Sequence, residues 1–317
     1  MPVPPETTAP IDPVQEAAAA PPTEHHGLWM QAWKRLQKMP GAMICFWIIM
    51  LLILLSACSW LNVPLTEFRY DQTSSEILAN PSAKHIMGTD ELGRDMLARI
   101  IFGARLSIAI GLVTAGIAFV IGTTYGSIAG FYGGKIDSIM MRGVDIAYAL
   151  PELLVMILVG VLLEKVEIFG QPIGRGTFGI LIALGLVSWM GTSRLVRAQL
   201  LQLQSEEFID AAKAAGRGTA EIIIKHMLPN AMGPIIVALT FTVPSAILSE
   251  STLSFIGLGL SPPACSWGTL ASDGWRSLRT HPHLILFPSL FIFVTVLSFN
   301  LLGDGLRDAL DPRTRRR

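Results

Sequence analysis

The stretch at residues 104–129, ARLSIAIGLVTAGIAFVIGTTYGSIA, decides the fold, because it carries no charged side chain after Arg105. At about 1.5 Å per residue, a helix of that length exceeds the roughly 30 Å hydrocarbon core of a bilayer. Five other stretches are long and apolar enough to cross the core as well: residues 43–62, 139–163, 177–198, 230–252 and 284–303. The sequence therefore predicts an all-α, polytopic membrane protein with six transmembrane helices.

The composition agrees with this fold class. Hydrophobic residues make up 51% of the 317-residue chain and charged residues 15%, whereas soluble domains carry about 25% charged residues. Glycines recur within the spans, among them Gly122 and Gly126, and we expect them to allow close helix packing. The third span is the least regular at its start, where Arg142 and Asp145 lie three residues apart and are predicted to pair.

The distribution of Lys and Arg predicts the orientation. If the N-terminus is cytoplasmic, most of the 24 basic residues fall on the cytoplasmic side, as the positive-inside rule requires, so we expect both termini to be cytoplasmic. The predicted segments are a disordered cytoplasmic tail at 1–27, a first transmembrane helix with a basic flank at 28–62, a periplasmic loop at 63–103, a five-helix core at 104–305 that includes a cytoplasmic loop at 199–229, and a cytoplasmic tail at 306–317.

Tryptophan and cysteine residues are interpreted as structural. Trp267 and Trp275, in the second exterior segment, are predicted to anchor at the membrane interface. Cys45 and Cys58 would lie about 20 Å apart in one helix, too far for a disulfide. Residues 55–58, LSAC, resemble a lipoprotein cleavage box, so lipidation of Cys58 stays an alternative to a retained helix. No C-x-x-C or H-E-x-x-H spacing points to a metal site.

The segment between the fourth and fifth spans carries the functional signal. A short helix is predicted from Ser205, which can cap it, to Gly216, which can end it with a positive φ. The side chains at helical spacing that would form one small apolar face are Phe208, Ala211, Ala212 and Ala215. Such a helix at the membrane surface fits a groove on a partner protein, but an ordinary alanine-rich loop explains the same pattern.

A resemblance favours the partner groove. Asp210-Ala211-Ala212, followed by Gly216 and Leu228-Pro229, resembles E-A-A-x3-G-x9-I-x-L-P, the signature of permease subunits of binding-protein-dependent ABC importers. Asp210 replaces the Glu of the signature, and His226 replaces its Ile. The residues that this resemblance assigns to ATPase coupling are Glu207, Phe208, Asp210, Ala211, Ala212, Gly216, Leu228 and Pro229.

The resemblance extends over roughly residues 85–312, in the family's order. The matching segments are 85–95, 103–107, 130–142, 207–212, 254–259, 266–268 and 300–312. They are similar to the C-type subunits of oligopeptide and dipeptide permeases, most of all the oligopeptide kind. The resemblance implies the type I ABC importer permease fold, a place in the bacterial inner membrane, and a role as half of a translocation pathway for peptides. Family members also carry dipeptides, nickel or other small solutes.

The resemblance also implies the partners. A homologous B-type permease would complete the pathway, two ATPase subunits would each hold one signature-loop helix, and a periplasmic peptide-binding protein would deliver the solute. ATP and Mg²⁺ would be bound by the ATPases, because Gly133-Gly134-Lys135 lacks the glycine and hydroxyl spacing of a P-loop. The chain is therefore predicted to be a transport subunit without cofactor or enzymatic activity, in contact with lipid and with no nucleic acid.

Glu250 is the residue that we expect on the solute path. An ionisable residue inside a span is costly to bury, so its presence there indicates a function. An interfacial carboxylate that reaches the headgroups explains it equally. The runner-up from another class is an ion-gradient-driven secondary transporter, which would need an internal repeat that we do not find. An intramembrane aspartyl protease is less favoured, because Tyr70-Asp71 and Gly303-Asp304 lie outside the span cores.

Overall fold

The computed structural model describes residues 28–61, 63, 65–163, 166–168, 171–172 and 177–311, so the predicted tail at 1–27 lies outside the described residues. Within them, five helices are long and apolar enough to cross a membrane: α3 (Pro40–Trp60), α4 (Met96–Tyr132), α7 (Thr177–Leu203), α10 (Leu228–Phe255) and α12 (His283–Leu310). Together, α5 (Gly134–Tyr148) and α6 (Glu152–Leu163) are also long and apolar enough to cross a membrane, which gives up to six spans if the bent pair counts as one. The predicted all-α, polytopic architecture is confirmed.

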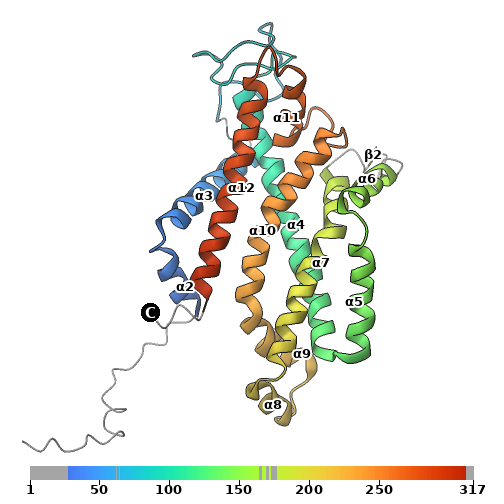
Figure 1. Ribbon diagram of the computed structural model, residues 1–317. Helices are drawn as coiled ribbons and strands as arrows, with labels where there is room; N and C mark the ends of the chain where they lie inside the picture. The colour runs from blue at the N-terminus through green and yellow to red at the C-terminus, as the bar shows by residue number, and fades with distance from the viewer. Residues whose placement is uncertain are drawn as a thin grey trace, which may run out of the picture.

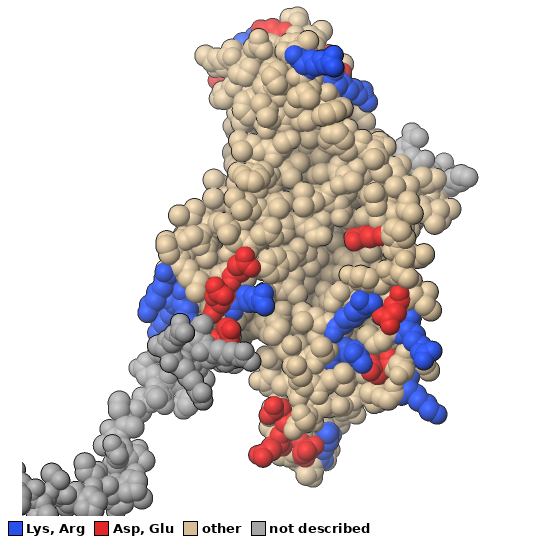
Figure 2. All heavy atoms as spheres, viewed as in Figure 1, with Lys and Arg blue, Asp and Glu red and all other residues tan. Residues whose placement is uncertain are grey.

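The long helices run between two ends that differ in structure. One end carries α8 (Glu207–Ala214), and the other carries α11 (Trp267–Arg276), as Figure 1 shows; we call them the α8 end and the α11 end. Charged side chains gather toward these ends, and the band between them holds few on the face shown in Figure 2. A short hairpin of β1 (Glu167–Ile168) and β2 (Gln171–Pro172) follows α6. The charge distribution suits a bundle whose middle lies in lipid.

The predicted first segment, 28–62, folds as two helices, α2 (Leu28–Leu36) and α3. The break falls at Met39, which is extended because the following Pro40 disfavours the helical conformation there. In α2, Ala32 and Leu36 are buried in a cluster that includes residues of α12, whereas Trp29 is exposed. This helix is therefore amphipathic and packs along the side of the bundle (Figure 1).

α4 begins at Met96, so the prediction that residues 96–103 belong to the periplasmic loop is wrong. Asp95 starts the helix, because its Oδ1 accepts a hydrogen bond from the Ala98 N–H at 2.8 Å. Hydropathy missed the first turns because they contain Arg99. That side chain is only 4% exposed and pairs with Asp90, so it is buried with its counter-charge.

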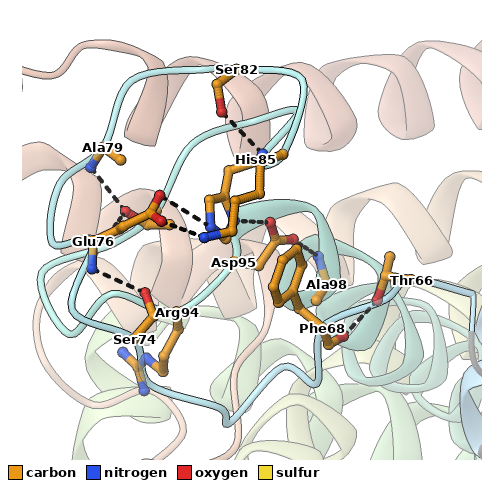
Figure 3. A network of polar contacts seen from close by, with 12 residues as sticks. Thr66, Phe68, Ser74, Glu76, Ala79, Ser82, His85, Arg94, Asp95 and Ala98 are labelled. Atoms are coloured by element: carbon orange, nitrogen blue, oxygen red, sulfur yellow. Dashed lines mark hydrogen bonds and ion pairs between the residues drawn. The ribbon is translucent and has the colours of Figure 1, made fainter.

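The loop before α4 lies over the α11 end of the molecule (Figure 1). Its side chains form the polar network that Figure 3 shows. His85 lies at its centre, 1% exposed, with Nδ1 2.8 Å from Asp95 Oδ2 and Nε2 3.6 Å from Glu76 Oε2. The ring of Phe68 stacks on His85 at a centroid distance of 4.5 Å. A hydrogen bond from Lys84 holds the pKa of Glu76 below its ordinary value. The network joins the loop to the residue that starts α4.

Trp267 is fully buried, so its predicted role as an interfacial anchor is wrong. Its indole N–H donates to the Ile100 carbonyl at 2.9 Å, and its backbone N–H donates to Ser107 Oγ at 3.0 Å. Both acceptors lie on α4, and Ser266 caps α11 directly before the tryptophan. The side chain therefore joins α11 to α4. Trp275, in contrast, is 56% exposed.

The third predicted span is broken, because α5 and α6 meet at 82°. Pro151 lies in the break, where it lacks a backbone donor and disfavours a helical Leu150. The predicted pair of Arg142 and Asp145 is wrong. Asp145 Oδ1 instead accepts from Arg194 Nη2 of α7 at 2.6 Å, so the ion pair joins two helices rather than two turns of one helix.

Three glycines of α4 let it approach α7 closely, as predicted for Gly122 and Gly126. A Cβ atom on Gly126 would lie 2.4 Å from the Ser193 carbonyl oxygen, and one on Gly122 would lie 2.7 Å from Thr192 Cβ. Gly130 repeats this contact one turn further along. Small residues at this spacing are typical of tightly packed helices in membranes.

α12 runs to Leu310, so the predicted cytoplasmic tail at 306–317 starts too early. The helix continues because Ala309 is buried in the same cluster as α2 and α3, with Leu306 and Leu310 packed against it. Arg35 of α2 also donates to the carbonyl oxygens of Ala309 and Asp311, both at 3.4 Å. Positions 312–317 lie outside the described residues.

Candidate functional site

The connection between α7 and α10 forms the α8 end of the molecule (Figure 1) and holds the candidate site. It consists of α8, α9 (Thr219–Ile222) and the π-helical turn η1 (Ile223–Met227). The predicted loop, 199–229, begins inside α7, and its last two residues, Leu228 and Pro229, open α10. In the sequence, the short helix α8 therefore lies between two long helices, α7 before it and α10 after it.

Glu206, not Ser205, occupies the N-cap position of α8, so the predicted cap is wrong. Ser205 Oγ donates instead to the Gln202 carbonyl at 3.0 Å, which satisfies an acceptor in the last turn of α7. Among the described residues, no side chain makes a capping hydrogen bond at the start of α8. Glu207 and Asp210 lie in its first turn, where their charges complement the helix dipole.

Gly216 ends α8 in the predicted way, with φ of +74°. Its N–H donates to the Lys213 carbonyl at 2.9 Å, and the N–H of Arg217 donates to the Ala212 carbonyl at 3.2 Å. This pair of bonds is the Schellman arrangement, which needs a left-handed residue that glycine adopts without strain. The turn fixes the direction in which the chain returns to α9.

Part of the predicted apolar face of α8 is buried against the rest of the chain, and part of it is exposed on the surface. Ile209 and Ala212 are buried in a cluster with Val196, Leu200 and Met227 from the neighbouring helices. Fully burying one isoleucine side chain contributes about 2 kcal/mol, so this contact holds α8 firmly. The side chains that remain exposed are Phe208, at 40%, Ala211 and Ala215. We call these three the docking row.

The return limb is more regular than a loop. α9, η1 and α10 follow one another without a break, and the π-helical turn contains His226. The sequence placed His226 at a loop edge, whereas its carbonyl accepts from Asn230 Nδ2 at 2.6 Å within a helical segment. Leu228 packs against the cluster beneath α8, and Pro229 fits the first turn of α10, where no backbone donor is needed.

Acidic side chains surround the docking row. Glu206, Glu207 and Asp210 are exposed, and Lys213 Nζ lies 3.1 Å from Asp210 Oδ1. Figure 2 shows acidic groups gathered at the tip over α8. The sequence analysis treated these charges as helix-dipole partners only. The excess of acids over bases in this segment was the signal for a negatively charged surface.

Glu250 lies apart from α8, toward the α11 end of α10. It is fully buried, and its Oε1 accepts hydrogen bonds from Ser254 at 2.8 Å and from Ser266 at 2.6 Å. Since Ser266 caps α11, the carboxylate joins α10 to that helix. Its place on a solute path stays a prediction. Within the described part of the chain, no group of three or more His, Cys, Asp or Glu residues is arranged to hold a metal ion.

If the turn couples an ATPase to transport, as the sequence resemblance implies, replacing Gly216 with valine is expected to lower the uptake per ATP hydrolysed. A Cβ atom there would meet no atom within 4 Å, so the cost is backbone strain alone. Forcing a left-handed conformation on an L-residue costs roughly 1–2 kcal/mol, enough to reduce coupled uptake about tenfold. The measurement is uptake per ATP hydrolysed by the complete transporter. The matched control is Gly218→Val, because Gly218 has φ of −69° and equally open surroundings. Unchanged uptake per ATP in G216V would contradict this account of the turn.

Comparison with known proteins shows which family the chain matches. Residues 122–316 match the family described as binding-protein-dependent transport system inner membrane component, and residues 27–81 match the N-terminal TM domain of oligopeptide transport permease C. The chain is 44% identical to the oligopeptide transport system permease protein OppC of Bacillus subtilis, with 91% of each chain covered. It is 45% identical to the dipeptide transport system permease protein DppC of the same organism, covering 90% of this chain and 86% of that one.

A solved structure shows the same fold at lower identity. The inward-facing MetNI methionine ABC transporter superposes with a TM-score of 0.56 at 19% identity, over 68% of this chain and 98% of the other. At this level the likeness concerns the fold alone. The family match spans most of the chain, and the relatives cover nearly its whole length. The chain therefore belongs to the family of binding-protein-dependent transport system inner membrane components, as an integral membrane transport permease.

Proposed function

We propose that this chain is the permease subunit of an ATP-driven peptide importer of the bacterial inner membrane. Relatives named for oligopeptide and dipeptide transport, 44% and 45% identical over nearly the full length, support peptides as the substrate class. The α8 end would face the cytoplasm and the α11 end the periplasm. This orientation would put the start of α2 and the end of α12 on the cytoplasmic side, and it is supported by the distribution of basic residues.

The docking row is the observation that carries the proposal. Phe208, Ala211 and Ala215 are exposed on a helix whose opposite side is buried in its own chain. Two alanines allow a groove to approach the backbone closely, and the phenylalanine between the acids supplies an apolar anchor. We infer that each ATPase subunit offers such a groove to one permease, with basic groups at its rim opposite Glu206, Glu207 and Asp210.

Movement of the ATPase would pass into the membrane through the cluster beneath α8. Ile209 and Ala212 join α8 to Val196 and Leu200 of α7, and Met227 lies directly before α10. A packed cluster transmits displacement because it has little room to deform. Displacing α8 would therefore move α7 and α10, and with them the pathway. ATP and Mg²⁺ would be bound and used by the ATPase subunits, so this chain would need no cofactor.

Two further partners complete the proposal. A homologous B-type permease would form the other half of the pathway, and a periplasmic peptide-binding protein would deliver the solute to the α11 end. In such an assembly, the binding protein would select the peptides that are delivered. The permease would then recognise only features that many peptides share.

Purification of the intact assembly tests the proposed function. The chain, tagged at its N-terminus, is solubilised from its native host and reconstituted in vesicles with the subunits that accompany it. We expect stoichiometric ATPase subunits, a second permease, and ATP-dependent uptake of trialanine once the binding protein is added. A homodimer that transports on a proton gradient would contradict the proposal.

A further inference from the structure

The break in the third span exposes a carboxylate within the membrane-spanning part of the protein. α5 ends at Tyr148, α6 begins at Glu152, and the two helices are bent by 82°. The Glu152 side chain is exposed on the surface of this chain. A helix interrupted at membrane depth is tolerated only where it is buried in protein or lines a water-filled cavity. Such breaks in transporters commonly lie where a substrate binds.

A polar cavity lies beside this break. It has a volume of about 240 Å³ and is lined by Tyr148 and Glu152 together with residues of α4, α7 and α10. Thr114 and Thr242, which face it from α4 and α10, lie midway along helices that run Met96–Tyr132 and Leu228–Phe255. The cavity is therefore at the middle of the bundle, where a span packed only for stability would present apolar side chains.

Hydroxyl groups without partners line the cavity. Thr114 is only 1% exposed, yet its Oγ1 has no hydrogen-bond partner among the residues that the structure describes, and neither has Ser188 Oγ. Ser245 and Ser249 of α10 lie on the same lining. Leaving a buried hydroxyl unsatisfied costs about 1–3 kcal/mol, so these groups point to a polar occupant.

The basic side chain near the cavity, Arg194, already has an acidic partner. Arg194 pairs with Asp145 and lies over the ring of Tyr148, 4.3 Å from its centroid. Within the described part of the chain, Glu152 takes part in no ion pair. Among the residues that line the cavity it is the one acid, and none of the others is basic. The cavity therefore favours a cation.

We infer that Glu152 and the hydroxyls around this cavity form a subsite for the primary ammonium group of a peptide in transit. An ammonium group has three donors and no acceptor, which suits one carboxylate and neighbouring hydroxyl oxygens. The cavity holds one end of a peptide rather than the whole molecule, so the subsite reads a feature that all unmodified peptides share. This inference rests on the proposed function.

Binding by the membrane assembly alone tests the subsite. Permeases and ATPases, without the binding protein, are placed in nanodiscs and dialysed against radiolabelled trialanine or N-acetyl-trialanine. We expect the wild type to bind the free-amino peptide about tenfold more tightly, the effect of one charge-assisted hydrogen bond, and Glu152→Gln to lose this preference. Glu152→Asp should retain part of it. The matched control is Glu67→Gln, an exposed acid in the loop before α4.

Two outcomes would overturn the inference. One is a Glu152→Gln assembly that keeps the preference for the free amino group, or a wild type that shows none. The other is loss of the second permease from the purified Glu152→Gln assembly, which would make the carboxylate a contact between subunits. Uptake of trialanine by wild-type vesicles separates these results from failure of the proposed function, because that uptake does not depend on which residue binds the amino group.

Discussion

Replacing Ala211 with arginine is expected to remove the ATPase subunits from the purified assembly and to abolish uptake. Ala211 lies in the middle of the docking row, where a partner groove must come close to the backbone of α8. An arginine there is too large, and it would place a positive charge in an interface whose other side we infer to be basic. Overpacking of an interface costs about 1–3 kcal/mol, which corresponds to a loss of about 10- to 100-fold in affinity.

The measurement is the ratio of ATPase to permease after purification, together with ATP-dependent uptake. Ala83→Arg is the matched control, because Ala83 is an exposed alanine in the loop before α4, at the opposite end of the molecule. It should assemble and transport as the wild type does. An A211R assembly with its full complement of ATPase would show that the docking row does not lie in the interface.

Replacing Gly126 with valine is expected to destabilise the bundle itself. A Cβ atom at this position would lie 2.4 Å from the Ser193 carbonyl oxygen and 2.8 Å from Val196 Cβ, so α4 and α7 must separate. Overpacking of this kind costs about 3 kcal/mol or more when backbone has to move. Gly116→Val is the matched control within the same helix, because its Cβ would meet nothing within 4 Å.

Both variants are compared by thermal unfolding of the purified chain in detergent and by its level in the membrane. G116V should resemble the wild type in both, whereas G126V should unfold at a clearly lower temperature and accumulate poorly. Equal stability of the two variants would mean that α4 and α7 are not in the close contact described here.

The spans could be predicted from the sequence because lipid imposes a simple requirement on length and apolar composition. The same criterion failed where charge is neutralised locally. Arg99 made the first turns of α4 look like a loop, but Asp90 pairs with it and the turns are helical. A hydropathy average also passes over a single proline, so the break at Pro151 and the exposed Glu152 beside it were missed.

Long-range contacts were beyond the reach of local patterns. Asp145 looked like a partner of Arg142 on one helix, and only the fold brings Arg194 within 2.6 Å of it. Trp267 looked like an interfacial residue because tryptophans after a span usually are, but two bonds to α4 require it to be buried. In both cases the deciding neighbour lies far away in the sequence.

The candidate site was predicted in part. The end of α8 was read correctly, since a glycine after a helix is a strong local signal for a left-handed turn. Its start was not, because Ser205 had a second acceptor in α7 that the sequence does not reveal. Helical spacing grouped Ala212 with the docking row, and only the packing of α8 on α7 shows that it belongs to the buried side.

The most direct test of the central claim is photo-cross-linking from the docking row. A benzophenone amino acid is introduced at Phe208 of the intact importer, and as a control at Ile182, which is equally exposed but lies on α7 within the membrane-spanning part. The account predicts that position 208 cross-links to the ATPase subunit and position 182 does not. Cross-links from position 208 only to lipid, to the second permease or to this chain itself would contradict it.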